Sequence, residues 1–271
     1  MGSEMCIRDR TKAFDTVDHY ILEQKLNNYG IRESALKWFT SYLRDRSHYV
    51  KIGSYTSEKV EATLGVPQGS ILGPLLFIIY TNDFTNLLDS ARVVQFADDT
   101  SIILSHKNPV NLTQKANDTL NLIYNWLNAN KLCLNIEKSS FLIITNKKQP
   151  IFTDIGINGI PIHRVRKCKI LGVLLDDQLK FTNHIQYVAN KIARISYVLH
   201  QLNSFIPNRT LKTIYHALAY PHLNYASIVW RNAPSYANDQ LFSIQKRMVR
   251  NIYAAEYLAC LLYTSPSPRD S

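Results

Sequence analysis

The sequence RVVQFADDTSIIL, residues 92–104, places two adjacent carboxylates between two short stretches that are rich in β-forming residues. Residues 92–96 and 101–104 each have the length of a short strand, and the few residues between them suit a tight turn. The stretch therefore predicts a β-hairpin with Asp98 and Asp99 at its tip. Because burying an unpaired charge is costly, carboxylates in this position favour water or a divalent cation as their partner.

An Asp-Asp pair is weak evidence on its own, since most such pairs are solvated turn residues. If Mg²⁺ bound there, two ions about 3.5–4 Å apart would suit phosphoryl transfer. The choice between a solvated turn and a metal site therefore depends on the rest of the chain.

The apolar spacing around this hairpin predicts a mixture of helices and strands. Helices are expected at Asp15–Asn28, Ser34–Leu43 and Val110–Asn130, and a further helix is expected to begin after the turn at residues 65–70 and to run through Leu75–Asn82. Strands are expected at Ser140–Thr145 and Ile170–Leu175, with a further hairpin around Gly53–Ser57. From Thr182 onward the pattern is helical alone, with one apolar stripe. The sequence thus predicts an α+β part, a boundary near Phe181 and an all-helical part.

The composition favours a nucleic-acid partner. The chain has 31 Lys or Arg against 21 Asp or Glu, a net charge of +10, and the basic residues are scattered rather than gathered into a tail. Its longest apolar run, Ile71–Tyr80, is interrupted by Gly73 and Pro74. That run is much shorter than the roughly 20 residues of a membrane span, so we expect no membrane association. The four cysteines form no CxxC pair, which favours an intracellular, reducing compartment.

The two ends of the chain are related to each other at the level of their codons. One oligonucleotide, read in opposite orientations, can encode GSEMCIRD at residues 2–9 and CLLYTSPS at residues 260–267. It resembles a transposase adaptor of the kind used to prepare sequencing libraries. We therefore expect residues 1–9 and 260–271 to be adaptor-derived, and exclude them from the predicted fold.

Five segments in order resemble the palm motifs of non-LTR retrotransposon reverse transcriptases. They are TKAFDTVDH at 11–19, GVPQGSILGPLLFIIYTND at 65–83, FADDT at 96–100, WLNANKLCLNIEKS at 126–139 and ILGVLLDDQLKF at 170–181. Residues 214–230 and 241–253 look like the thumb of jockey-like elements. The resemblance therefore covers nearly all of residues 11–258.

The resemblance implies a right-hand polymerase with a ferredoxin-like antiparallel palm sheet, helices and an all-helical thumb. Residues 10–181 would be the palm with partial fingers, and residues 182–259 the thumb or connection. The implied activity is RNA-directed DNA polymerisation on an RNA template and a DNA primer, with deoxynucleoside triphosphates. Two Mg²⁺ ions, or Mn²⁺ in their place, would assist nucleotidyl transfer. Proteins of this family are expected in the nucleus or the cytoplasm.

The resemblance also assigns catalytic roles. Asp98 would ligate both metals, and Asp99 would supply a supporting charge. Asp9 falls six residues before Asp15, where the family has its other metal-binding Asp. Lys138 matches a lysine that could protonate the pyrophosphate leaving group, although a lone lysine after a turn is usually just solvated.

Three further residues would contact the substrates. Phe14 falls at the steric gate that excludes a 2′-OH, with an ordinary core phenylalanine as the competing interpretation. Gln68 and Gly69 would lie against the template and the nascent base pair, with a helix-entry turn as the alternative.

One departure from the family pattern concerns Asp9. It lies inside the adaptor-like stretch, and Glu4–Ile7 replaces the strand that should hold it, so precise placement is not expected. The resemblance also implies that the part of the fingers that grips the triphosphate, any endonuclease domain and any Cys/His knuckle lie outside this sequence. We therefore expect the chain as written to polymerise weakly or not at all. A catalytically dead RNA-binding remnant and a maturase-like RNA-binding protein are the alternative functions.

Overall fold

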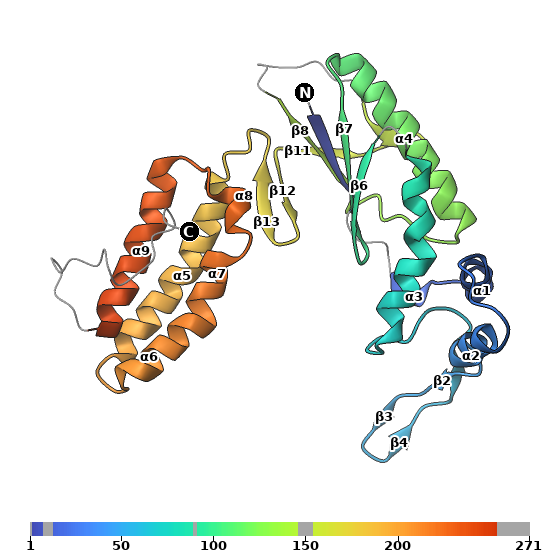
Figure 1. The fold of residues 1–271 in the computed structure, drawn as a ribbon, viewed down its shortest axis with the longest axis horizontal. Helices are drawn as coiled ribbons and strands as arrows, with labels where there is room; N and C mark the ends of the chain where they lie inside the picture. Colours follow the sequence, from blue (N-terminus) through green and yellow to red (C-terminus); the bar gives the residue numbers. More distant parts are fainter. Residues whose placement is uncertain (1, 8–12, 89–90, 146–153, 254–271) are drawn as a thin grey trace. The chain divides into compact units, whose positions relative to one another are not determined.

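The computed structural model describes residues 2–7, 13–88, 91–145 and 154–253, with backbone only for residues 2–7. The chain divides into two compact units, Met1–Arg166 and Lys167–Ser271 (Figure 1). Each unit has a hydrophobic core of its own, and each is described by itself.

A five-stranded sheet forms the centre of unit 1. Its strands are β1 (Gly2–Ile7), β6 (Arg92–Phe96), β7 (Asp99–Ser105), β8 (Ser140–Ile144) and β11 (His163–Val165). Their order is β11-β8-β1-β7-β6, and every pairing is antiparallel except that of β11 with β8. Helices connect β1 to β6 and β7 to β8, so the element order is that of a ferredoxin-like sheet. The predicted mixture of helices with an antiparallel sheet is confirmed.

The central position of β1 differs from expectation. We excluded residues 1–9 from the fold, yet the backbone of Gly2–Ile7 lies between β7 and β8, with Gly2 opposite Ser105 and Ile7 opposite Thr100. A β-ladder uses backbone N–H and C=O groups, so many sequences can complete it. The exclusion was therefore wrong for these six residues as part of the fold, while their adaptor origin stays a prediction.

The helices of unit 1 are close to those expected. They are α1 (His19–Asn28), α2 (Glu33–Leu43), α3 (Leu72–Thr81) and α4 (Pro109–Ala129), with the 3-10 helices η1 (Ala13–Asp15) and η2 (Asn82–Leu87). α1 begins after Asp18, whose carboxylate accepts from the Ile21 N–H at 3.0 Å. α4 begins in the same way after Asn108, with a proline in its first turn.

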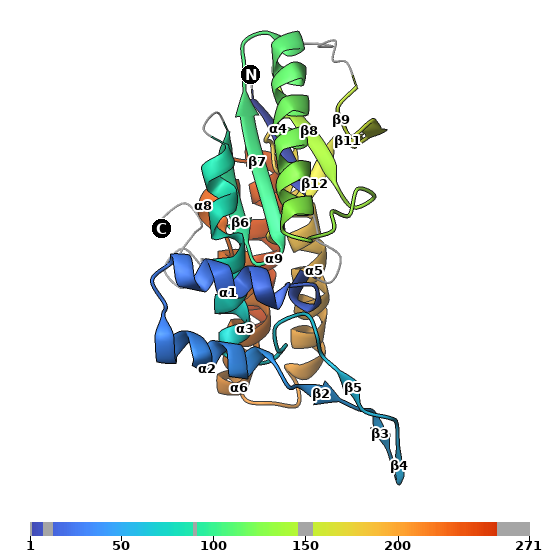
Figure 2. The same ribbon diagram turned by 90° about the vertical axis from the view of Figure 1, so that its right-hand side faces the viewer.

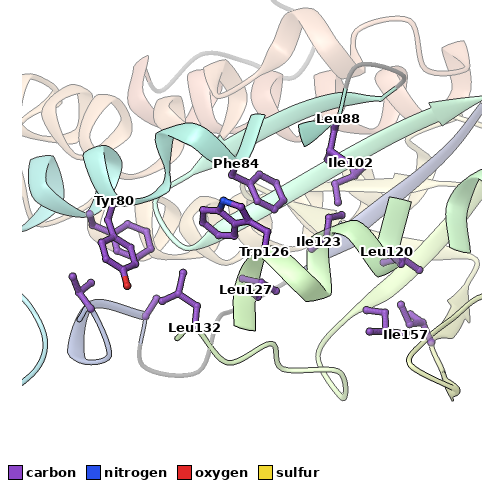
Figure 3. Close-up of a cluster of buried hydrophobic side chains, with 14 of the residues drawn as sticks. Tyr80, Phe84, Leu88, Ile102, Leu120, Ile123, Trp126, Leu127, Leu132 and Ile157 are labelled. Carbon is purple, nitrogen blue, oxygen red and sulfur yellow. The ribbon is translucent and has the colours of Figure 1, made fainter. Parts of the chain in front are cut away.

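The core of unit 1 lies between α3, η2, α4 and the sheet. Figure 3 shows Phe84 against Trp126, whose rings meet edge to face at 5.0 Å, and Ile102 beneath Leu88. Tyr80 is fully buried and donates to the Asn130 carbonyl at 2.6 Å. Each large apolar side chain buried here contributes about 1.5–3 kcal/mol, so α3 and α4 are held firmly against the sheet.

A β-arm extends from unit 1 between α2 and α3 (Figure 2). It pairs β2 (Ser47–His48) with β5 (Val60–Glu61), and β3 (Lys51–Ile52) with β4 (Tyr55–Thr56). This is the hairpin that the sequence predicted around Gly53–Ser57. A smaller hairpin of β9 (Gly156–Ile157) and β10 (Ile160–Pro161) brings Ile157 to the face of α4 that carries Leu120 (Figure 3).

Unit 2 is a β-hairpin followed by helices. The hairpin is β12 (Lys167–Ile170) and β13 (Val173–Asp176), and the helices are α5 (Thr182–Leu202), α6 (Asn208–Ile214), the π-helix η3 (Tyr215–Ala219), α7 (Tyr220–Asn224), α8 (Ser227–Trp230) and α9 (Ser235–Tyr253). The predicted helical pattern after Thr182 is confirmed for the described residues. None of the helices described in either unit combines the length and apolar character that a bilayer crossing requires.

One expectation near this hairpin was wrong. Ile170–Leu175 is not one strand, because Leu171 and Gly172 have φ of 44° and 90° and turn the chain into a hairpin. The change from strands to helices alone falls between Asp176 and Thr182, as expected, but the division into compact units lies earlier, between Arg166 and Lys167. The physical reason is that Val173 and Phe181 are buried in the second core, so the hairpin packs with the helices.

Candidate active site

The two adjacent carboxylates lie at the tip of the β6–β7 hairpin, as predicted. Phe96 pairs with Asp99, which leaves Ala97 and Asp98 as the two residues of the turn. Ala97 adopts the left-handed region with φ of 51°, which for a non-glycine residue costs about 1–2 kcal/mol. Asp98 and Asp99 are both half-exposed, so their charges reach the surface of the hairpin.

Neither carboxylate has a partner among the residues that the structure describes. Among the described residues, the Asp98 and Asp99 side chains form no hydrogen bond and no ion pair. Oxygen ligands of this kind suit a hard divalent cation such as Mg²⁺. No group of three or more His, Cys, Asp or Glu residues is assembled for a metal within the described part of the chain. Asp9 lies outside the described residues, and β1 ends at Ile7, opposite Thr100.

Phe14 lies at the start of the chain's first motif and packs against α3. Its ring centroid is 4.7 Å from that of Phe77, and its side chain is half-buried. Its carbonyl accepts from the Val66 N–H at 2.8 Å, which ties the first motif to the second. Phe14 therefore has a structural role beside the core, and the residue stays partly exposed.

The second motif approaches the first through glycine. Gly65 has φ of 82°, and a Cβ added there would lie 2.8 Å from Asp15 Cα, so no other residue fits without displacing the backbone. Three residues later, Gln68 Nε2 donates to Asp15 Oδ1 at 2.7 Å. Gly69 also has a positive φ, of 81°, in open space. The structure thus brings Phe14, Gln68 and Gly69 into one turn region, with Asp15 as a member that the sequence interpretation did not single out.

The carbonyl oxygen of Gly65 accepts two hydrogen bonds. His19 Nε2 lies 2.8 Å from this oxygen, and a guanidinium nitrogen of Arg46 lies 2.9 Å from it. Arg46 stands at the base of the β-arm, so the arm, α1 and the second motif are joined at one atom. His19, Arg46 and Gly65 are far apart in the sequence, so the motifs did not predict these contacts.

Asp18 and Lys131 join the first motif to the fourth. Their Oδ2 and Nζ atoms are 2.7 Å apart, and Asp18 is also the N-cap of α1. Burial would raise the pKa of the Asp18 carboxyl, but the hydrogen bonds from Lys131 and the Ile21 N–H outweigh it and hold that pKa below its usual range. Asp18 is therefore a structural carboxylate that is already neutralised.

Lys138 lies in the turn between α4 and β8. Its side chain is exposed, and its backbone N–H donates to Asn135 Oδ1 at 3.2 Å. Its neighbour Ser139 is buried and donates to the Asn135 carbonyl at 2.8 Å. The turn is therefore well ordered by Asn135, and it presents Lys138 to solvent.

The fold and these motifs are similar to those of known proteins. Residues 4–175 match the family described as reverse transcriptase (RNA-dependent DNA polymerase). The chain is 26% identical over 260 residues to the "Probable RNA-directed DNA polymerase from transposon X-element" of Drosophila melanogaster. It has the same identity over 260 residues to that from mobile element jockey of the same species. Both alignments cover 92% of this chain and 28% of the relative, so the chain spans less than a third of either protein.

Among solved structures, telomerase from Candida albicans in complex with a fragment of telomeric RNA aligns with 94% of this chain and 48% of its own. The TM-score is 0.47 and the identity is 13%. The family match covers more than half of the 271 residues, and the named relatives are polymerases of mobile elements. The resemblance to non-LTR retrotransposon polymerases is confirmed, and the chain belongs to the reverse transcriptase family.

Proposed function

We propose that the parent protein is an RNA-directed DNA polymerase of a non-LTR retrotransposon, which copies an RNA template from a DNA primer. The observation that carries this proposal is the pair of half-exposed carboxylates at the β6–β7 tip, unsatisfied by the described residues, within a reverse transcriptase family match. In this proposal unit 1 contains most of the palm with part of the fingers, and the helices of unit 2 are the thumb.

Asp98 and Asp99 are suited to hold divalent metal, because their oxygens have no competing donor in the described part of the chain. Asp98 would be the direct ligand, with Asp99 as supporting charge and Asp9 as the carboxylate from the first motif. When bound, Mg²⁺ or Mn²⁺ stabilises the charge on the attacking and leaving oxygens of nucleotidyl transfer. The protein's own part is to hold these carboxylates on a rigid hairpin.

Phe14, Gln68 and Gly69 are proposed to contact the incoming nucleotide and the template. The accessible part of the Phe14 ring would exclude a 2′-OH, while its contact with Phe77 fixes the ring in place. The Gln68 amide is oriented by Asp15, and Gly69 has no atom within 4 Å of an added Cβ, so its backbone is open to a ligand. The turn would therefore support a base pair through both a fixed amide and an accessible backbone.

Lys138 is proposed as the general acid for the pyrophosphate leaving group. Its exposed side chain can reach solvent-borne substrate, and the Asn135-stabilised turn limits the movement of its backbone. An ammonium group in this role would donate its proton as the leaving oxygen gains charge.

The test is primer extension by the full-length parent protein, with oligo(dT) on poly(rA), Mg²⁺ and thymidine triphosphate. Asp98→Ala should lower extension at least about 100-fold, which corresponds to about 2.7 kcal/mol of lost transition-state stabilisation. Asp118→Ala is the matched control, because Asp118 is an exposed aspartate on α4. Extension should remain close to wild type in that control. The 271-residue chain itself should extend the primer weakly or not at all.

Two results would contradict the proposal. If Asp98→Ala still extended the primer, the β6–β7 hairpin would not take part in catalysis. A full-length parent that binds RNA but never extends a primer would favour the second candidate, a non-catalytic RNA-binding remnant, which the net charge of +10 supports.

A further inference from the structure

The outer edge of strand β13 has a backbone donor that its own hairpin cannot satisfy. Among the described strands, β12 and β13 pair only with each other, and Ile170 and Val173 are the pair beside the two-residue turn. In a two-residue hairpin the residues beside the turn exchange hydrogen bonds, and those of the next pair, here Lys169 and Leu174, point outward. The Leu174 N–H therefore needs an acceptor from another element.

That acceptor is a buried histidine near the start of α5. The Leu174 N–H donates to His184 Nδ1 at 3.3 Å, and His184 is 3% exposed. A ring nitrogen that accepts a hydrogen bond carries no proton, so the neutral ring has its proton on Nε2. Nε2 is buried and has no hydrogen-bond partner among the described residues. The backbone of β13 thus selects one tautomer of one neutral side chain.

A second proton on His184 is incompatible with this arrangement. It would go to Nδ1, where two donors, the ring N–H and the Leu174 N–H, would face each other. Burial, and to a smaller degree the charge of Lys169, hold the pKa of His184 below its usual value of 6.5. The contact therefore contributes its full stability above about pH 6.5, and this contribution is lost as the pH falls through the folded pKa.

The elements around the ring do not supply a compensating negative charge. Lys169 of β12 is the charged group that acts on His184, and no acid contributes to the shift of its pKa. The acids of the neighbouring elements are Asp176 of β13, whose oxygens accept from the loop N–H groups, and Asp239 of α9. The neighbouring rings are those of Tyr187 and Trp230, with centroids 6.3 and 5.7 Å away. A protonated His184 therefore has no counter-ion among the described residues.

We propose that His184 positions β13 on α5 only while its ring is neutral, so that the Leu174 edge of the fifth motif, residues 170–181, detaches from the helix in mildly acidic solution. The hairpin has other attachments, since Val173 is buried in the second core and the Tyr225 hydroxyl donates to the Leu171 carbonyl at 2.6 Å. The expected change is therefore a local opening at one edge and not the unfolding of unit 2.

Hydrogen exchange and imidazole NMR of the 271-residue chain test this switch. At neutral pH the proton of His184 should be found on Nε2. The protection factor of the Leu174 amide should fall at least about tenfold between about pH 7.5 and about pH 5.5, in step with the protonation of the ring. The amides of Val188 and Ile192, in the buried face of α5, should stay protected.

Three results would overturn the proposal. The first is a proton on Nδ1 at neutral pH. The second is Leu174 protection that does not follow the titration of His184. The third is a ring that stays neutral until the whole chain unfolds, because the release would then not be local.

Two asparagine variants separate this histidine from the others. His184→Asn places an amide oxygen close to the position of Nδ1, where it can accept but cannot be protonated. Its Leu174 protection factor should change less than about twofold over the same pH range. The control is His200→Asn, because His200 is an exposed histidine in the last turn of the same helix. The control should lose Leu174 protection as the wild type does, and equal behaviour of the two variants would overturn the switch.

A lysine variant keeps the test decisive if His184→Asn fails to fold. Lys169→Gln removes the positive charge that opposes protonation of His184, so the midpoint of the release should move to higher pH. Lys212→Gln, on α6, removes one charge elsewhere in unit 2 and should leave the midpoint in place. A midpoint that Lys169→Gln does not move would mean that another group controls the release.

A second readout tests the positioning role, and it alone rests on the proposed function. In the full-length parent, primer extension should fall more steeply below about pH 6.5 in the wild type than in His184→Asn. Equal acid losses in the two proteins would overturn the positioning role. A parent that extends no primer at any pH, with the release of Leu174 intact, would overturn only the polymerase proposal.

Discussion

Two Asp-Asp pairs, Asp98–Asp99 and Asp176–Asp177, lie at hairpins of this molecule, and their surroundings differ. Asp98 and Asp99 are half-exposed, and the described residues give them no hydrogen bond or ion pair. Asp176, at the end of β13, is 8% exposed and accepts from the N–H groups of Gln178, Lys180 and Phe181 at 3.1, 3.0 and 2.8 Å. The first pair is therefore open to a ligand, whereas Asp176 of the second pair stabilises a loop. What distinguishes them is whether the local backbone already supplies donors.

The largest effect on stability should come from Asp176→Ala. The change leaves three backbone N–H groups without their acceptor, one of them at the buried Phe181, and should destabilise unit 2 by about 3 kcal/mol. Asp98→Ala should change stability by less than about 0.5 kcal/mol, because its side chain forms no hydrogen bond or ion pair with the described residues. Urea unfolding followed by circular dichroism measures both.

Asp176→Asn refines this comparison. The amide oxygen still accepts but lacks the charge, so the loss should be intermediate, at about 1–2 kcal/mol. If Asp98→Ala proved as destabilising as Asp176→Ala, the hairpin carboxylates would be structural, and the contrast between the two pairs would fail.

The turn of the β12–β13 hairpin contains a glycine, whereas the turn of the β6–β7 hairpin contains Ala97 and Asp98. The β12–β13 turn has Gly172 at φ of 90°, and a Cβ there would lie 3.3 Å from the Tyr225 ring, whose hydroxyl donates to the Leu171 carbonyl at 2.6 Å. Gly172→Ala should destabilise unit 2 by about 2 kcal/mol, from the strained φ and the displaced ring together. Thermal unfolding of the variant tests this. A neutral result would mean that the turn rearranges freely.

Much of the local structure could be predicted from the sequence, because its signals are local. The β6–β7 hairpin follows from β-rich stretches around a short polar turn, and α4 and α5 follow from their apolar stripes. The turn at Leu171 and Gly172 was missed because an apolar run masked its glycine. The place of Gly2–Ile7 between two strands depends on pairings with residues about 90 to 140 positions away, and no local pattern encodes it.

For the candidate site, too, the sequence predicted the local features and missed the long-range contacts. The hairpin position of Asp98 and Asp99 was predicted correctly, whereas their catalytic roles, like those of Asp9 and Lys138, stay predictions. The contacts that hold the motifs together were invisible in the sequence. Gln68 reaches Asp15 across 53 positions, and Lys131 reaches Asp18 across 113. Such pairs arise from tertiary packing, which sequence spacing does not report.

Asp18 offers an intermediate case between the open pair and Asp176. Its folded pKa lies below the ordinary value of 3.8. Its contribution to stability is therefore present above that value and is lost as the pH falls through the folded pKa. Because the Lys131 side chain is 64% exposed, solvent screening limits the ion pair to about 1 kcal/mol at most. Lys131→Met should lose that amount at neutral pH and nothing in acid, as urea unfolding at both pH values would show. A pH-independent loss would mean that packing, not charge, is responsible.

The smallest effect concerns the backbone that carries the open pair. Ala97 is held at φ of 51°, whereas the other hairpin has glycine in its turn. Ala97→Gly should stabilise unit 1 by about 0.5 kcal/mol, since relief of the left-handed strain slightly exceeds the added freedom of the unfolded chain. The same freedom loosens the turn that positions Asp98, so extension by the full-length parent should fall about two- to threefold. Stability and activity should thus move in opposite directions in one variant. If stability and activity both rose, the left-handed conformation of Ala97 would not be what holds the carboxylates in place for catalysis.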